Sequence, residues 1–264
     1  MRDFSKTVKN LVMISALLGA VMTGACGVLA GSDDASNIFG PVKEEDYLRG
    51  RFNPEKHPLF VKLGDHGIPC DRPHYLRKEA AAALKKMYIA MKKDLPGVKF
   101  WVQSSTRNWN SQKAIWERRW KGIATKNKKA TDADIAAAIL RSSSMPGTSR
   151  HHWGTDFDIN VLKNDYYEKG DGAKLYQWLK KHAGDYGFCK PYSAGRTAGY
   201  MEERWHWSYL PLASDFQKRW NDLFGETPED IISDGRFQGA EGAIADAPEY
   251  VNSIDESCLG EDGR

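Results

Sequence analysis

Residues 149–158 read Ser-Arg-His-His-Trp-Gly-Thr-Asp-Phe-Asp, and residues 203–206 read Glu-Arg-Trp-His. A hydrolytic zinc ion takes three protein ligands, commonly His nitrogen and carboxylate oxygen, and keeps a fourth position for water. The two stretches contain that ligand set. We therefore predict His151, Asp158 and His206 as the ligands of one Zn2+ ion, which two neutral imidazoles and one carboxylate would leave with a net charge of +1.

Hydrolysis also needs a separate carboxylate to accept the proton of the water, and Glu203 is the candidate general base. Two neighbours compete for these roles. His152 adjoins His151, and adjacent residues of an extended chain point apart, so we expect only His151 to face the metal. Glu202 competes with Glu203, and only the spacing to His206 favours Glu203. On a flat strand Glu203 and His206 would face opposite sides, so the shared site requires a bend between them.

The pattern Ser149-x-His151-x-x-Gly154-x-x-x-Asp158, followed by Glu203-x-Trp205-His206, resembles the paired motifs of the VanY-type D-alanyl-D-alanine carboxypeptidases. These enzymes are zinc metallopeptidases of the LAS superfamily, which includes lysostaphin-like enzymes and the hedgehog fold. The resemblance implies an α+β fold with a small central antiparallel sheet flanked by helices, one zinc ion and peptidoglycan peptides as substrates. One departure is Asp156, where many members have Ala. An acid there could support a ligand or alter substrate choice.

A third segment, Ser104-Ser105-Thr106-Arg107 with Gln112 five residues later, resembles the substrate-binding stretch of the same family. Arg107 is predicted to hold either the terminal carboxylate of the substrate or the oxyanion that develops at the cut carbonyl, since a planar guanidinium suits both. Ser149 and Gln112 are further candidates for hydrogen bonding to the substrate.

Apolar spacing predicts the secondary structure. A period of three to four residues indicates helices, and alternation indicates strands. The predicted helices and strands do not follow the regular βαβ alternation of an α/β fold. The class predicted is therefore α+β with a small, antiparallel sheet. The predicted helices are 74–95, 110–120, 135–140 (capped by 131–134), 173–183 and 214–224, and the predicted strands are 98–104, 155–161 and 204–210.

Near the N-terminus, basic residues precede the apolar stretch 11–22, in the order typical of an export signal. Residues 23–26 resemble a lipoprotein cleavage box, which would leave Cys26 lipid-modified, although Thr23 departs from its usual aliphatic residue. Cleavage after Ala30, or no cleavage and a membrane span over 10–32, are the alternatives. Each places the remaining chain outside the cytoplasm, in the periplasm or cell envelope.

Charged residues are unevenly distributed along the chain. Residues 226–264 contain eleven acidic residues and two arginines, a net charge of −9, so the other 225 residues carry 3 − (−9) = +12. We predict a signal over 1–30, a linker over 31–54, a zinc peptidase domain over 55–225 and an acidic, disordered tail over 226–264. The basic body favours an anionic partner, and export disfavours nucleic acid as that partner.

If Cys26 is lipidated or removed, Cys70, Cys189 and Cys258 remain. One pair could form a disulfide in an oxidising compartment, and the sequence does not indicate which. The absence of a CxxC spacing argues against a cysteine zinc site.

These observations lead to one functional prediction: zinc-dependent hydrolysis of the D-Ala–D-Ala bond in peptidoglycan stem peptides. Two alternatives remain open. The same chemistry could serve an endopeptidase that cuts an L-Ala–D-Glu bond or a cross-bridge, because bond choice depends on loop shape. A non-catalytic, zinc-stabilised wall-binding module is the third hypothesis, and Glu203 beside the ligands counts against it.

Overall fold

The structure is a computed structural model that describes residues 38–260. The predicted export signal, Cys26 and the alternative span over 10–32 lie outside this range. Among the helices of residues 38–260, none is both long and apolar enough to cross a lipid bilayer.

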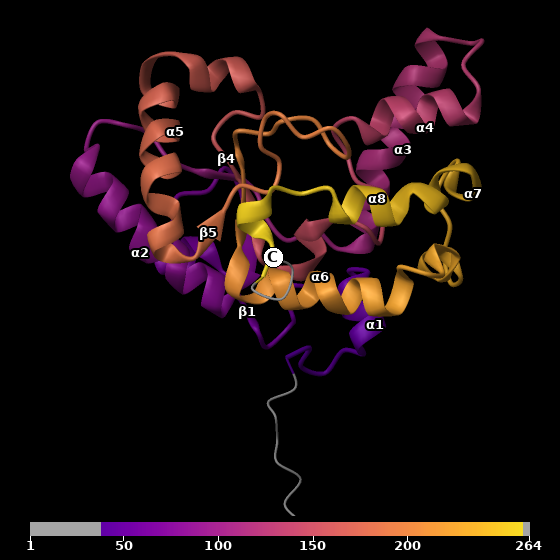
Figure 1. The fold of residues 1–264 in the computed structure, drawn as a ribbon. Helices are drawn as coiled ribbons and strands as arrows, with labels where there is room; N and C mark the ends of the chain where they lie inside the picture. The colour runs from indigo at the N-terminus through magenta and orange to yellow at the C-terminus, as the bar shows by residue number, and fades with distance from the viewer. Residues whose placement is uncertain (1–37, 261–264) are drawn as a thin grey trace, which may run out of the picture. The chain divides into compact units, whose positions relative to one another are not determined.

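The chain folds into short strands and helices of varied length (Figure 1). The strands are β1 (Phe60–Lys62), β2 (Tyr75–Arg77), β3 (Val102–Ser104), β4 (Asp156–Ile159), β5 (Phe188–Cys189) and β6 (His206–Tyr209). The helices are α1 (Glu44–Leu48), α2 (Lys78–Asp94), α3 (Trp109–Lys126), α4 (Asp132–Leu140), α5 (Gly170–His182), α6 (Leu210–Phe224), α7 (Ala240–Ala243) and α8 (Ala247–Asn252). Single 3-10 turns join several of them.

The central sheet has the strand order β3-β4-β6-β5, and each neighbouring pair is antiparallel. Strands β1 and β2 form a separate antiparallel pair. The predicted α+β class with a small antiparallel sheet is therefore confirmed.

The register of β4 and β6 sorts their side chains onto two faces. Asp158 pairs with His206 and Phe157 pairs with Trp207. Because successive side chains of a strand point to opposite faces, the two aromatic residues share one face and the polar pair shares the other. The aromatic face joins a hydrophobic core with α2 and α5, which lie together on one side of the sheet (Figure 1). Asp158 and His206 therefore lie together on the polar face, where a site can form.

A second hydrophobic core lies among α1, α3, α4, α6, α7 and α8. The helically spaced Trp109, Trp116 and Trp120 are all buried in it, as their spacing predicts. Thr131 and Asp134 form a reciprocal capping box at the start of α4, which confirms the predicted helix start.

Several predicted element boundaries differ from the structure, including the end of the helix predicted over 110–120, which continues to Lys126, and the start of the helix predicted over 214–224, which begins at Leu210. Two further differences have a clear physical reason. Residues 74–95 were predicted as one helix, but Tyr75–Arg77 pairs with β1 and the helix begins at Lys78. Strand β3 covers only the end of the predicted strand 98–104. Helical spacing extends into residues 75–77, but tertiary pairing with β1 determines their conformation.

The predicted disordered tail is wrong for the residues that the structure describes. Residues 228–258 form short helical turns, and Ile231, Phe237 and Val251 are buried in the second core. Cys258 is bonded to Cys189 on β5. The sequence did not indicate that this segment folds, for two reasons. Its content of acidic residues is high, and turns of three to six residues are too short to show apolar periodicity.

The described part of the predicted linker, residues 38–54, is also folded. Tyr47 and Leu48 on α1 are fully buried, and the Tyr47 hydroxyl donates to the Trp153 carbonyl at 2.9 Å. The globular body therefore extends on both sides of the predicted limits 55 and 225.

Candidate active site

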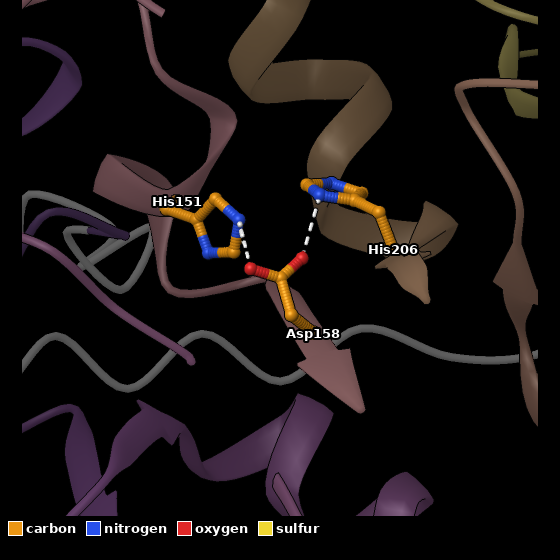
Figure 2. A group of neighbouring side chains, drawn as sticks. All are labelled: His151, Asp158 and His206. Carbon is orange, nitrogen blue, oxygen red and sulfur yellow. Dashed lines mark ion pairs between the residues drawn. The ribbon is translucent and has the colours of Figure 1, made fainter. Parts of the chain in front are cut away.

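Three side chains from distant parts of the chain converge on the polar face of the sheet. His151 lies on the 3-10 turn Arg150–Trp153, Asp158 on β4 and His206 on β6. The ligand atoms of these three side chains all lie within 4.8 Å of one another, and all three residues are buried. Figure 2 shows the Asp158 carboxylate between the two imidazoles.

Donor atoms at this site fit a metal ion. His151 Nε2 lies 3.4 Å from one Asp158 oxygen, and His206 Nδ1 lies 3.0 Å from the other. Within residues 38–260, His151 Nε2 and Asp158 Oδ1 are buried without a hydrogen bond of good geometry. A tetrahedral zinc site with bonds of 2.0–2.1 Å separates its ligand atoms by about 3.3 Å. The predicted ligands therefore form a candidate metal site.

Each imidazole has its other nitrogen occupied. His151 Nδ1 lies 2.9 Å from the Ser105 carbonyl, and His206 Nε2 lies 3.0 Å from Asp156 Oδ1. These acceptors require a proton on the atoms that face them, so His151 Nε2 and His206 Nδ1 are the atoms that could bind a metal ion. Burial lowers the pKa of His206, but hydrogen bonds to Asp156 and Asp158 outweigh it and raise the pKa to about 9, so a metal ion would have to displace the proton on Nδ1.

A glycine makes the turn between the first two ligands possible. Gly154 follows the 3-10 turn at φ +76°, in the left-handed region that favours glycine. A Cβ atom at this position would lie 2.3 Å from a ring carbon of Phe60. Any other residue would strain the turn that carries His151 and displace Phe60.

His152 is a structural residue. Its Nδ1 lies 2.5 Å from the Arg107 carbonyl, and its Nε2 accepts a hydrogen bond from the Gly147 N–H at 3.0 Å. The side chain is fully buried. Burial lowers the pKa of His152 to about 3, which keeps it neutral with one nitrogen donating and one accepting. Both ring nitrogens are therefore engaged away from the candidate metal ligands, as the adjacency argument predicts.

Glu203 and Glu202 face different surroundings. Glu203 Oε2 lies 3.6 Å from His206 Nδ1, and the side chain lines the same cleft as the ligands. Glu202 pairs with Lys190 at 3.0 Å and with Arg204 at 3.3 Å, in a separate pocket. The geometry therefore favours Glu203 as the base.

Burial and charge shift the pKa values of the site. Burial raises the pKa of Glu203 to about 7, although His206 opposes the shift. For Asp158, His151 and His206 outweigh burial and hold the pKa well below its usual range. Burial lowers the pKa of His151 to about 4. At physiological pH Asp158 is thus anionic and His151 neutral, the protonation states that a metal ion would require of them.

Arg107 lies beside the candidate ligands. Its Nη2 atom is 3.9 Å from Asp158 Oδ2, and its buried Nε has no hydrogen-bond partner among residues 38–260. The backbone N–H of Arg107 donates to the His151 carbonyl at 3.1 Å, which fixes its segment against the turn that carries that ligand. The Arg107 side chain lines the cleft and is 21% exposed, so its guanidinium is accessible to a substrate oxygen.

The two remaining predicted substrate contacts are buried away from the cleft. Gln112 is fully buried and donates to the Ser144 carbonyl at 2.7 Å, so the structure gives it the role of holding residue 144 at the cleft wall. Ser149 is 1% exposed and its hydroxyl has no partner within the described range. Contact of Ser149 with a substrate stays a prediction.

The cleft has a volume of about 340 Å³ and contains residues that the sequence analysis did not single out. Tyr192 and Tyr200 come from the loop before β6, with ring centroids 5.1 Å apart. They have no regular spacing, and only their position upstream of Glu203 could have indicated them. A larger pocket of about 860 Å³, between α5 and the 190–204 loop, does not contain the metal ligands. Other lining residues of the smaller cleft include Arg72, Gln103, Arg118, Arg119, Ser142, Ser143, Ser144 and Trp205.

A buried His-Asp-His donor set, with a carboxylate and an arginine beside it in a small α+β fold, is typical of single-metal hydrolases. The family model for VanY, D-alanyl-D-alanine carboxypeptidase, matches residues 73–212. The chain belongs to this family and is a metallopeptidase of the carboxypeptidase type.

Two relatives of known name are similar in sequence. Putative carboxypeptidase YodJ of Bacillus subtilis is 29% identical over 197 residues, which is 66% of this chain and 67% of that protein. A D-alanyl-D-alanine carboxypeptidase of Enterococcus faecalis is 30% identical over 131 residues. That match spans 49% of this chain and less than half, 46%, of the relative.

Solved structures of similar proteins include a vancomycin resistance D,D-pentapeptidase VanY in complex with Zn(II). It is 24% identical, with 58% of this chain and 82% of that chain covered and a TM-score of 0.45. The LdcB LD-carboxypeptidase is 23% identical, with 71% and 82% covered and a TM-score of 0.48.

Proposed function

We propose that this protein is a zinc-dependent carboxypeptidase that removes the terminal D-alanine from peptidoglycan stem peptides ending in D-Ala–D-Ala. The observation that carries the proposal is the convergence of His151, Asp158 and His206 with Glu203 in one cleft. The family supplies the substrate class, and the E. faecalis relative bears the name of this activity.

His151 Nε2, one Asp158 oxygen and His206 Nδ1 would hold the zinc ion. When bound, zinc supplies a Lewis acid that activates water and polarises the carbonyl. Glu203 accepts a proton from the attacking water, and a pKa of about 7 allows the same carboxyl group to return that proton to the leaving amine. Arg107 stabilises either the oxyanion that forms at the carbonyl or the terminal carboxylate of the peptide.

Electrostatics of the cleft support an anionic substrate. Four arginines line it, namely Arg72, Arg107, Arg118 and Arg119, against the two carboxylates Asp158 and Glu203. With a divalent ion the sum is 4 + 2 − 2 = +4. A stem peptide with a free terminal carboxylate complements such a surface.

The test is a digest of purified muropeptides with and without a zinc chelator, analysed by mass. Loss of one terminal alanine, abolished by chelator and restored by zinc, is the expected result. Cleavage within the stem or a cross-bridge would show the endopeptidase alternative. Wall binding without any product would show the non-catalytic alternative.

We propose further that the protein is exported and acts in the cell envelope. The basic and apolar order of residues 2–22 and the family substrate support export. The Cys189–Cys258 disulfide is consistent with an oxidising compartment. Labelling cells with a fatty acid probe and comparing a Cys26→Ser variant would test the lipid anchor, because only a lipoprotein loses its label in the variant.

A further inference from the structure

Beside the metal ligands lies a buried ion pair that the proposed mechanism does not use. Arg150 and Asp156 are 1% and 0% exposed, and Arg150 Nε donates to Asp156 Oδ1 at 3.1 Å. Neither residue lines the cleft. A buried ion pair seldom stabilises a fold beyond what apolar residues of equal volume would provide, because both charges lose their hydration. This pair therefore requires another explanation.

The Asp156 carboxylate is aimed at one metal ligand. Its Oδ1 lies 3.0 Å from His206 Nε2, while its Oδ2 accepts from Ser208 Oγ at 3.0 Å and from Thr155 Oγ1 at 2.5 Å. Both oxygens are thus fixed from several sides. An acceptor at Nε2 keeps a proton on that nitrogen and leaves Nδ1, which lies 3.0 Å from Asp158 Oδ1, as the atom that would bind the metal ion.

The two histidine ligands are oriented by different chemical groups. His151 is held by a neutral acceptor, the Ser105 carbonyl, whereas His206 is held by the Asp156 carboxylate. A carboxylate at the outer nitrogen makes an imidazole a more basic ligand as well as an oriented one. The alternation of β4 explains the position of Asp156, since it lies on the same face as Asp158 two residues later.

Arg150 is itself anchored by its two outer nitrogens. Its Nη2 donates to Ser208 Oγ at 2.9 Å, and its Nη1 donates to Gln217 Oε1 at 3.0 Å. Gln217 lies on α6, and its Nε2 donates to Asn252 Oδ1 at 3.1 Å on α8. A continuous set of hydrogen bonds therefore joins His206 to a segment beyond the residues 73–212 that match the family.

We propose that Asp156 is a positioning residue for the metal ligand His206, that Arg150 holds the Asp156 carboxylate in place, and that Gln217 anchors Arg150 to the C-terminal segment. The inference rests on the proposed zinc site. It assigns to this site a charged outer layer on the His206 side, supported by Asn252 on α8.

Zinc affinity is the property that tests the proposal, measured by competition with a chromogenic chelator. A single Asp156→Ala change would leave the Arg150 charge buried and unpaired, which costs stability directly. The informative variants are Asp156→Asn, which also removes the charge but keeps the side-chain volume and one acceptor oxygen, and the double variant Asp156→Ala/Arg150→Met, which removes both charges. We expect each to bind zinc roughly 10- to 100-fold more weakly than the unaltered chain.

A matched control separates positioning from general stability. Arg49, with a side chain 7% exposed, pairs with Asp234 at 3.0 Å. Its guanidinium also donates to Glu45, Asp46, Asp230 and Ile231, and none of these residues is a ligand of the candidate metal site. The variant Arg49→Met/Asp234→Asn should lower the thermal midpoint of the metal-free protein and leave zinc affinity unchanged.

Wild-type zinc affinity in both Asp156 variants, with only the thermal midpoint lowered, would overturn the positioning role. If the double variant does not fold, Asp156→Asn decides alone, and unchanged affinity in it overturns the proposal. Failure of the zinc site itself is distinguishable, because the unaltered protein would then bind no zinc.

Discussion

Glu203 Oε2 lies 3.6 Å from His206 Nδ1. On a flat strand, two residues three positions apart would point to opposite faces. A turn resolves the conflict. The His206 N–H donates to the Glu203 carbonyl at 3.4 Å, and β6 begins only at His206. The turn brings the proposed base to the ligand side of the sheet, as the shared site requires.

Replacement of the proposed base gives the first prediction. Glu203→Gln should lower the rate of D-alanine release by about 10²- to 10⁴-fold while zinc content stays at one ion per chain, because Gln cannot accept the proton. Glu202→Gln is the matched control and should retain activity within a few-fold, since Glu202 faces a separate pocket. Equal losses in the two variants would contradict the assignment.

Arg107 provides a second prediction. Arg107→Lys keeps the charge but loses the planar pair of donors, so kcat/KM should fall roughly 10- to 100-fold, the value of a charge-assisted hydrogen bond. A rise in KM would assign Arg107 to the terminal carboxylate, and a fall in kcat would assign it to the oxyanion. Unaltered kinetics on a D-Ala–D-Ala peptide would exclude both roles.

The third prediction concerns the pH dependence of stability. The pKa of buried His152 is lowered to about 3, whereas an unfolded chain has an ordinary histidine pKa near 6.5. Below pH 6.5 His152 is protonated in the unfolded state but stays neutral in the folded state. The free energy of unfolding therefore falls as pH falls, by up to about 1.4 kcal/mol per pH unit for this group.

Denaturant titrations of metal-free protein between pH 7 and 4.5 would measure this slope. His152→Gln, which has no titrating group, should show a shallower fall by about that amount. Identical slopes for the variant and the unaltered chain would show that His152 does not remain neutral in the folded state.

Removal of the disulfide is the fourth prediction. Cys189 and Cys258 are 69 residues apart, and a loop of that length corresponds to about 4 kcal/mol of stabilisation in the chain-entropy description. Cys258→Ser should therefore lower the free energy of unfolding by an amount of this order under oxidising conditions. Cys70→Ser is the control and should change it little, because Cys70 has no disulfide partner among residues 38–260 and is only partly buried.

A fifth prediction tests the folded C-terminal segment. Phe237 is buried against Trp116, with ring centroids 5.3 Å apart, so Phe237→Ala should destabilise the protein by about 3–5 kcal/mol. Glu241→Ala, at an exposed position nearby, should change stability by less than about 0.5 kcal/mol. Thermal unfolding of the two variants measures the difference. A Phe237→Ala variant as stable as the unaltered chain would mean that this segment does not pack on the core.

The fold class and the convergence of the three candidate ligands were predictable because their signals are local. Strand alternation in 204–210 placed Trp207 on one face and His206 on the other, and β6 follows it. The spacing of His151, Gly154 and Asp158 describes a turn and a strand within ten residues. Such patterns depend on backbone geometry, which neighbouring residues largely determine.

Contacts across long stretches of chain could not be predicted in the same way. The pairing of Cys189 with Cys258 and the burial of Ile231 and Phe237 depend on which surfaces meet, and short turns carry no periodic signal of burial. The hydrogen bond of Gln112 to the Ser144 carbonyl could not be predicted from residue spacing either, since the two residues are 32 positions apart.

The sequence by itself therefore determined the chemistry: which residue types could hold a metal, which acid could act as base and which class of fold would carry them. Tertiary structure alone decided their surroundings, including the contact of Asp156 with His206, the separation of Glu203 from Glu202 and the packing of the acidic segment. The physical reason is that side-chain type and backbone period are encoded locally, whereas burial, pKa and hydrogen-bond partner depend on segments that meet only when the chain folds.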